Sequence, residues 1–378
     1  MSVFLDALHR RPTSHTPIWL MRQAGRYQAS YQAIRSKVEF LELCKTPELA
    51  CQVTFDAVDQ LGVDAAIIFA DILLILEPLG IPFSFEKGHG PKIHTPIRTA
   101  AQVDAIPNSI DIESLGYVME AIKLARRAID VPLIGFAGAP FTLASYAIEG
   151  AGSKNYFATK KIMYGDEGMW RALMEKFSTA LGQYLNAQID AGAQCIQIFD
   201  SWVGCLSPAD YRRFVLPYSR KVLAAVKGRV PTIHFGTGNP SLYPLLKEAG
   251  GTTIGVDWRT PIDEMWDRLG DDVGVIGHPV PAPPLSPRRP RVRRSRSPSR
   301  SFLPSPVAGS LAGARWHLPA AASPNRSPPP ATGLRHRAPL AGPPARWSSR
   351  QRRRGPAHAA RLPCARGTAG GTRPRAAS

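Results

Sequence analysis

The last hundred residues of the chain lack several of the residue types on which folding depends. Residues 279–378 contain no Lys, Asp, Glu, Ile or Tyr, but they hold 20 Arg and 20 of the 36 Pro residues. A segment this poor in β-branched and aromatic side chains cannot bury enough apolar surface to offset its chain entropy. We therefore predict one folded domain, residues 1–278, followed by a disordered Arg/Pro-rich tail, residues 279–378.

The positive charge of the chain is confined to the same tail. The whole chain has 47 Lys and Arg against 29 Asp and Glu, a net charge of +18. Removing the 20 tail arginines leaves 47 − 20 = 27 basic and 29 acidic residues in the front domain, a net charge of −2. An evenly spread excess would indicate a nucleic-acid or membrane-surface protein. The folded domain shows no such excess.

Several sequence patterns are absent, and each absence excludes a class of protein. No apolar run approaches 18 residues, and the five cysteines form no C-x-x-C. These absences argue against a membrane span, a disulfide framework and a cysteine zinc site. No nucleotide-binding glycine motif and no H-E-x-x-H occurs, and the first 20 residues lack the apolar stretch of a signal peptide. We expect a cytoplasmic protein with neither metal nor cofactor.

Short apolar runs alternate with segments of helical periodicity. The runs are apolar at nearly every position, which is typical of parallel strands covered on both faces. The predicted strands are Ala66–Asp71, Pro132–Ala137, Gln194–Asp200, Pro231–Gly236, Thr252–Asp257 and Val273–Gly277. The predicted helices run from Thr46-Pro47-Glu48 to Gly62, over 111–130, over 169–189 and from Ser207-Pro208 onward.

This alternation predicts an α/β fold with a parallel sheet, either a doubly wound sheet or a (β/α)8 barrel. Polar residues lie at or near the ends of several strands, namely Asp71, Asp200, His234 and Asp257. Polar ends on so many strands favour the mouth of a barrel over a single crevice. Six strands are found where a barrel has eight. We therefore predict a distorted TIM barrel that is incomplete at its C-terminal end.

Two arginines, Arg22 and Arg26, flank the sequence Gln23-Ala24-Gly25. Arginine recognises carboxylates through two parallel hydrogen bonds and stays charged at any working pH. The pair therefore indicates an anion site. The alternative interpretation is an exposed face of a helix.

Three further candidates lie close to strand ends. Asp71 stands between two apolar runs, where a carboxylate is costly unless bonded; it either caps the loop or stabilises a cation. Tyr146 follows the glycine-rich turn 135–142 and is either a packing residue or a ligand contact. Ser201 could donate a hydrogen bond to a carboxylate, with Asp200 orienting it. Together the candidates suggest binding and charge stabilisation of a polyanionic substrate.

Five segments, in order, resemble the uroporphyrinogen decarboxylase family. They are PIWLMRQAGRY (17–27), FADILLILEPLG (69–80), GFAGAPFTLASYAIEG (135–150), FDSWVGCLSP (199–208) and VDWRTP (256–261). The resemblance covers about residues 3–277. It implies a distorted (β/α)8 barrel, usually a homodimer, that removes CO₂ from the four acetate side chains of uroporphyrinogen to give coproporphyrinogen in haem or chlorophyll biosynthesis, without cofactor or metal.

The resemblance also implies roles for individual residues. Arg22, Gln23, Ala24, Gly25 and Arg26 would bind the substrate, with both arginines on its carboxylates. Asp71 would bind the central pyrrole N–H groups and stabilise the protonated ring, and Arg22 is a candidate for delivering the ring proton. Tyr146 and Ser201 would contact the substrate side chains.

The sequence departs from the family pattern after Gly277. The family continues there with a G-N-L-D-P stretch and later an N-L-G-H-G segment whose histidine contacts the substrate, whereas this chain reads Gly277-His278-Pro279. The tail is rich in residues with GC-rich codons, which suggests a shift of reading frame near Gly277. We expect this chain to be poorly soluble and to have little or no decarboxylase activity.

Two other functions compete with this interpretation. An inactive truncated barrel could bind nucleic acid or other polyanions non-specifically through Arg-rich stretches such as 291–300. A corrinoid-linked methyltransferase would share the fold, but its usual His-x-Cys zinc element does not occur. We expect neither specific nucleic-acid binding nor membrane binding.

Overall fold

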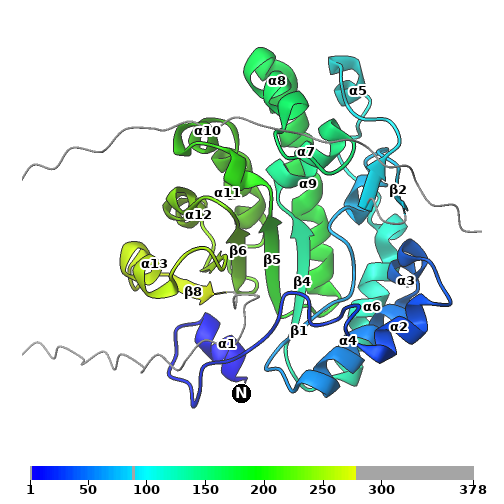
Figure 1. Cartoon of the computed structure of the whole chain (residues 1–378), viewed down its shortest axis with the longest axis vertical. Helices are drawn as coiled ribbons and strands as arrows, with labels where there is room; N and C mark the ends of the chain where they lie inside the picture. Colours follow the sequence, from blue (N-terminus) through cyan, green and yellow to red (C-terminus); the bar gives the residue numbers. More distant parts are fainter. Residues whose placement is uncertain (1, 87–89, 278–378) are drawn as a thin grey trace, which may run out of the picture. The chain divides into compact units, whose positions relative to one another are not determined.

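The computed structural model describes residues 2–86 and 90–277, which lie in one compact unit (Figure 1). The predicted boundary at 278/279 and the predicted disorder of 279–378 lie outside the described residues. A continuous cluster of buried apolar side chains joins the sheet to the surrounding helices. Among the described helices none has both the length and the apolar character needed to cross a membrane.

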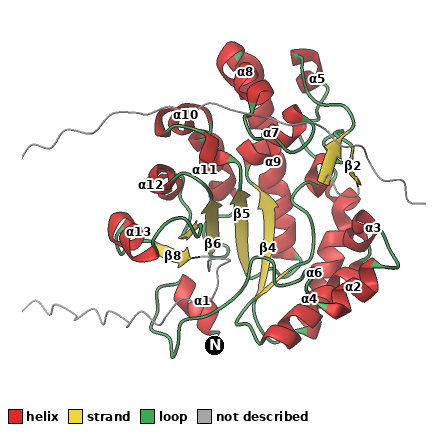
Figure 2. Ribbon diagram, viewed as in Figure 1, coloured by secondary structure: helices red, strands yellow, loops and turns green. Residues whose placement is uncertain are grey.

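The core of the fold is a sheet of six parallel strands in the order β1-β4-β5-β6-β7-β8. All six predicted strands are present, with β1 much shorter than predicted. Strands and helices alternate along the chain, and the helices lie around the sheet (Figure 2). The sheet therefore confirms the α/β barrel-like class and the count of six strands. The strands are β1 (Ala66–Ile67), β4 (Leu133–Gly138), β5 (Cys195–Asp200), β6 (Thr232–Gly236), β7 (Thr253–Val256) and β8 (Gly274–Gly277).

The predicted helices form where their end signals lie. Helix α4 (Pro47–Leu61) begins with its proline in the first turn and ends at Gly62, whose φ of 59° is the left-handed conformation that glycine tolerates. In α10 (Pro208–Phe214), the Ser207 side chain accepts a hydrogen bond from the Asp210 N–H. The other predicted helices correspond to η2 (Ile112–Leu115) with α6 (Gly116–Ala128), and to α9 (Glu167–Asp190).

Several elements are absent from the sequence prediction. Most are short, and the two extra strands form a separate antiparallel pair, β2 (Phe83–Glu86) with β3 (Gly90–Ile93). The further helices are α1 (Val3–Leu8), α2 (Ala29–Arg35), α3 (Phe40–Lys45), α5 (Ala100–Asp104), α7 (Pro140–Glu149), α8 (Phe157–Gly165), α11 (Leu216–Ala225), α12 (Tyr243–Glu248) and α13 (Ile262–Leu269), with short 3₁₀ turns at Leu74–Leu76, Val203–Cys205 and Pro240–Leu242.

Helix α1 joins the two ends of the described chain. Its residues Phe4 and Leu8 are buried in the core. Just beyond the helix, the Arg10 guanidinium donates a hydrogen bond to the carbonyl of Asp271, 261 residues later in the sequence (3.0 Å). The first helix is therefore held by contacts made far along the chain.

One face of the sheet buries a row of phenylalanine rings. Phe136, Phe199 and Phe235 lie on one face, with ring centroids 5.4 and 5.9 Å apart in edge-to-face contacts. On β4, the α9 side chain Gln188 bonds both the N–H and the carbonyl of Phe136 (2.8 and 2.9 Å). A Cβ on Gly135 would lie 2.6 Å from Gln188 Oε1, so this glycine allows close packing between sheet and helix rather than approach of a ligand.

Candidate active site

Arg22 lies in a turn that precedes the barrel strands. Residues 21–27 form turns and bends rather than a helix, so the alternative of an exposed helix face is wrong. The turn is fixed internally: Gly25 N–H donates to Gln28 Oε1 (3.1 Å), and the Tyr27 hydroxyl donates to the carbonyl of Gln23. The Arg22 side chain is exposed and makes no ion pair within residues 2–86 and 90–277. An exposed, unpaired guanidinium on an ordered turn suits an anionic ligand.

Gln23 occupies the centre of this turn and is only 1% exposed. Its Oε1 accepts a hydrogen bond from Leu20 N–H (3.4 Å), and its buried Nε2 has no partner among the described residues. Ala24 and Gly25 are half-buried. A buried amide donor without a partner costs free energy, so it is a candidate for bonding a ligand.

Arg26 is the second exposed arginine of the turn. Its carbonyl accepts a hydrogen bond from Gln32 Nε2 (2.5 Å), and its charge lowers the pKa of Tyr31, which burial raises overall. The Tyr31 ring lies 5.7 Å from that of Phe69. Arg26 therefore lies near Tyr31.

Asp71 lies in the loop that follows β1. Its Oδ1 accepts a hydrogen bond from Leu73 N–H (2.9 Å), so it caps the loop, as one interpretation held. Burial raises the pKa of Asp71 to about 6, while the Leu73 bond and the nearby Arg22 charge act in the opposite direction. A carboxyl group whose pKa is raised by burial in a loop after a strand is typical of a functional site.

Tyr146 lies on α7 and shares the environment of Asp71. Burial and the charge of Asp71 raise the pKa of Tyr146 to about 12, and Arg22 opposes the rise. The Tyr146 ring stacks on that of Trp202 at 3.7 Å between centroids, and Tyr156 meets Trp202 edge-on at 5.2 Å. Tyr156 has φ 55°, a strained conformation for a tyrosine. The rings of Tyr146, Trp202 and Tyr156 together form an aromatic wall, and no sequence pattern predicted Trp202 and Tyr156 as parts of it.

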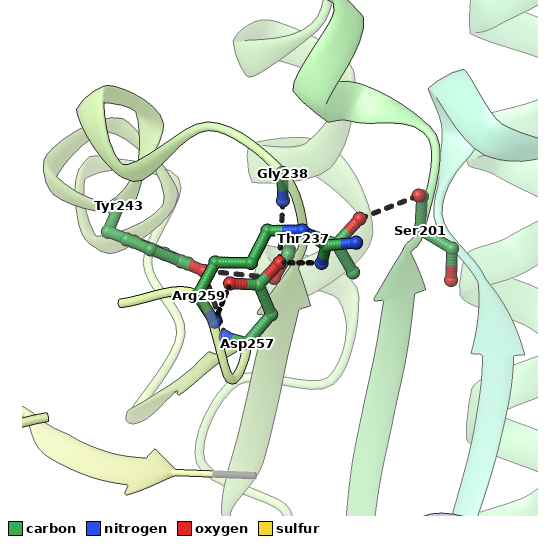
Figure 3. Close-up of polar contacts among 7 residues, drawn as sticks. Ser201, Thr237, Gly238, Tyr243, Asp257 and Arg259 are labelled. Atoms are coloured by element: carbon green, nitrogen blue, oxygen red, sulfur yellow. Dashed lines mark hydrogen bonds and ion pairs between the residues drawn. The ribbon is translucent and has the colours of Figure 1, made fainter. Parts of the chain in front are cut away.

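Ser201 lies at the end of β5, beside the loop that follows β6 (Figure 3). Its carbonyl accepts a hydrogen bond from Thr237 Oγ1 (2.9 Å). The next residue, Gly238, donates its N–H to Asp257 Oδ2 (2.8 Å), and Asp257 also binds the Arg259 guanidinium (2.7 Å). These bonds connect the ends of β5, β6 and β7. Asp257 is thus a structural residue that ties loops together.

Asp200 does not lie with the other strand-end residues, contrary to the prediction, and His234 is a buried core histidine. Both side chains are 0% exposed, and they face the helices on the other side of the sheet. Asp200 accepts a hydrogen bond from Thr142 of α7, and His234 lies against the Leu246 carbonyl of α12. We expected Asp200 to orient the Ser201 hydroxyl, but its carboxylate bonds Thr142 instead. Strand alternation sends the last side chain of β5 away from the barrel interior.

A cavity of about 820 Å³ lies at the opposite ends of the strands. Its lining includes Leu8 of α1, Gln194 before β5 and Thr252 before β7. None of the predicted site residues lines it. Among the described residues no group of three His, Cys, Asp or Glu side chains is placed to hold a metal ion.

The structure thus brings Arg22, Asp71 and Tyr146 together, and Ser201 directly precedes Trp202, whose ring stacks on Tyr146. A family model described as uroporphyrinogen decarboxylase matches residues 1–294. This chain belongs to the uroporphyrinogen decarboxylase family. The match includes residues 278–294, beyond the last recognised motif.

Proteins of this family are similar to the chain over most of their own length. Relatives named uroporphyrinogen decarboxylase from Sorangium cellulosum and Carboxydothermus hydrogenoformans are each 51% identical to it, over 78% and 75% of this chain and 85% and 82% of theirs. A solved methyltransferase from Methanosarcina mazei superposes with a TM-score of 0.58 at 20% identity, covering 73% of this chain and 81% of that one. At that identity the likeness shows the fold alone.

Proposed function

We propose that the strand-end site binds uroporphyrinogen and supports decarboxylation of its four acetate side chains to coproporphyrinogen in tetrapyrrole biosynthesis. The observation that carries the proposal is the electrostatic coupling of Arg22, Asp71 and Tyr146, since the charges of the first two act on each other and on the third. Relatives about half identical to the chain carry this enzyme's name.

Asp71 is the residue on which the chemistry depends. Loss of CO₂ leaves a carbanion-like carbon, and a pyrrole ring protonated beforehand accepts the electron pair. A fixed carboxylate next to that cation stabilises charge where it develops in the transition state. The same carboxylate accepts hydrogen bonds from the central N–H groups of the macrocycle. The cationic ring in turn favours ionised Asp71, which burial alone disfavours.

The Arg22–Arg26 turn positions the substrate. Exposed guanidinium groups on Arg22 and Arg26, with the unpaired amide of Gln23 between them, bind the propionate and acetate carboxylates and orient the ring. Tyr146 and Ser201 contact the side chains from α7 and β5. In this proposal Arg22, next to Asp71, also delivers the ring proton. The pyrrole is its own electron sink, so no metal or cofactor takes part.

The departure from the family sequence after Gly277 is expected to reduce decarboxylase activity. The family's histidine segment has no counterpart in the sequence after Gly277. We expect uroporphyrin to bind while turnover stays close to background. We also propose the cytoplasm as the compartment and the homodimer as the family's assembly, without a membrane partner.

Binding and turnover are measured separately on the purified full chain. Uroporphyrin, the oxidised form of the substrate, is titrated by fluorescence, and Asp71→Asn is expected to weaken its binding at least tenfold. Uroporphyrinogen is incubated without oxygen, and the products are separated after oxidation. Equal affinity in the parent and in Asp71→Asn contradicts the proposed site. Rapid coproporphyrinogen formation contradicts the expected loss of activity.

The tail supports a second proposal, non-specific binding of polyanions. Its 20 Arg and absence of acidic residues make attraction to phosphates independent of sequence. Binding to nucleic acids of unrelated sequence should be equal and should fall steeply with salt. Clear preference for one sequence, or salt-independent affinity, contradicts this proposal.

A further inference from the structure

Two buried polar atoms behind the site face each other without a hydrogen bond. Asp200 Oδ2 and His234 Nε2 lie 3.9 Å apart, and both side chains are 0% exposed. Neither atom has a hydrogen-bond partner among the described residues. An unsatisfied buried polar atom costs about 1–3 kcal/mol, so a pair of them calls for a physical explanation.

The partner of the other imidazole nitrogen decides what can lie between them. His234 Nδ1 lies 3.3 Å from the carbonyl of Leu246, which can only accept, so Nδ1 carries the proton. When Nε2 carries no proton it is an acceptor, and it faces an acceptor oxygen of Asp200. A single water that donates one hydrogen to each atom satisfies both.

The second oxygen of Asp200 connects this buried pair to the site wall. Thr142 Oγ1 donates to Asp200 Oδ1 (3.0 Å) and itself accepts the backbone N–H of Trp202 (3.2 Å). Thr142 lies one helical turn before Tyr146 on α7. The Tyr146 ring stacks on Trp202. The Thr142 hydroxyl thus links the Asp200 carboxylate to two segments: α7, which carries Tyr146, and the loop after β5, which carries Trp202.

We propose that Asp200, held by Thr142 and by a water shared with His234, is a positioning residue that fixes Trp202 against Tyr146. It does not touch the substrate; it sets the aromatic wall that the substrate meets. Only the expected effect on ligand binding rests on the proposed function. The packing of Trp202 on Tyr146 is a property of the ligand-free protein.

The test compares two substitutions of one residue in the full chain. Thr142→Val keeps the shape and removes the hydroxyl, whereas Thr142→Ser keeps the hydroxyl. We expect Thr142→Val to reduce the near-UV circular dichroism of the stacked rings and to weaken uroporphyrin binding about tenfold, the equivalent of one lost hydrogen bond. Thr142→Ser should restore both. Trp202→Phe identifies the part of the near-UV signal that belongs to Trp202.

Several outcomes would overturn the proposal. A folded Thr142→Val with the parent's near-UV spectrum and affinity does so, as does failure of Thr142→Ser to restore them. If far-UV spectra show Thr142→Val unfolded, Thr142→Ala removes the same hydroxyl without setting a methyl group against Asp200, and the same criteria apply. If the parent itself does not bind uroporphyrin, the proposed function fails, and the near-UV comparison alone decides the positioning role. A high-resolution density map without water between Asp200 and His234 refutes the bridge.

Discussion

Substitution of Asp71 by Asn should make the protein more stable at pH 8 while weakening its binding of the substrate. Burial raises the pKa of Asp71 from 3.8 to about 6, so the folded state binds the proton more tightly than the unfolded chain. Stability therefore falls as pH rises from about 4 to about 6, and the penalty persists above that range. Asn carries no charge and still offers an oxygen to the Leu73 N–H.

The magnitude follows from the size of the pKa shift. A rise of about two units corresponds to about 3 kcal/mol, at 1.36 kcal/mol per unit. The side chain is partly exposed, so solvent reduces this value, and we expect a gain of about 1–2 kcal/mol. Stability gained by neutralising a functional residue is a common form of the trade-off between stability and activity.

Urea unfolding of the full chain at pH 8 and at pH 4 measures the effect. Asp71→Asn should raise the free energy of unfolding at pH 8 and leave it almost unchanged at pH 4. Asp59→Asn is the matched control, because Asp59 is exposed on α4 and should show no such difference. If Asp71→Asn is less stable than the parent at pH 8, the charge of Asp71 stabilises the fold, and the reasoning fails.

Three further predictions concern the same site. Arg22→Ala should raise the pKa of Asp71 further, and Arg26→Ala should not; ¹³C NMR of the carboxyl carbon reports both, and equal shifts would contradict the assignment of Arg22 as the neighbour. Uroporphyrin affinity should fall as pH drops through about 6, because protonated Asp71 is a weaker hydrogen-bond acceptor for the central N–H groups than the carboxylate; a flat profile contradicts this. Tyr146→Phe should change stability by less than about 0.5 kcal/mol, whereas Trp202→Ala should cost about 2–4 kcal/mol in thermal or urea unfolding, because only the second removes the stacked ring.

The parts of the fold that the sequence predicts are those with strong local signals. Strands covered on both faces read as apolar runs, and Thr46-Pro47 with Gly62 marks both ends of α4. The β2–β3 pair has no such signal, since its strands are four residues long and half-exposed. Short helices such as α1 likewise owe their stability to burial in the core rather than to their own sequence.

The candidate site was predictable in its members but not in its geometry. The proximity of Arg22 to Asp71 depends on how a turn folds against a strand end 49 residues later, and no spacing encodes that. The prediction for the Asp200 side chain is wrong for a different reason. Adjacent residues Asp200 and Ser201 look alike in the sequence, but the register pairs Ile198 with His234, and Asp200 lies on their face of the sheet.

The contact of Arg10 with Asp271 has a consequence during synthesis. Arg10, just after α1, is made 261 residues before its partner Asp271. At about 5–20 residues per second, that interval is roughly 10–50 s. For that time the Arg10 guanidinium lacks this partner. Because this contact can close only after residue 271 is made, we expect substitutions in α1 to alter unfolding rates more than folding rates.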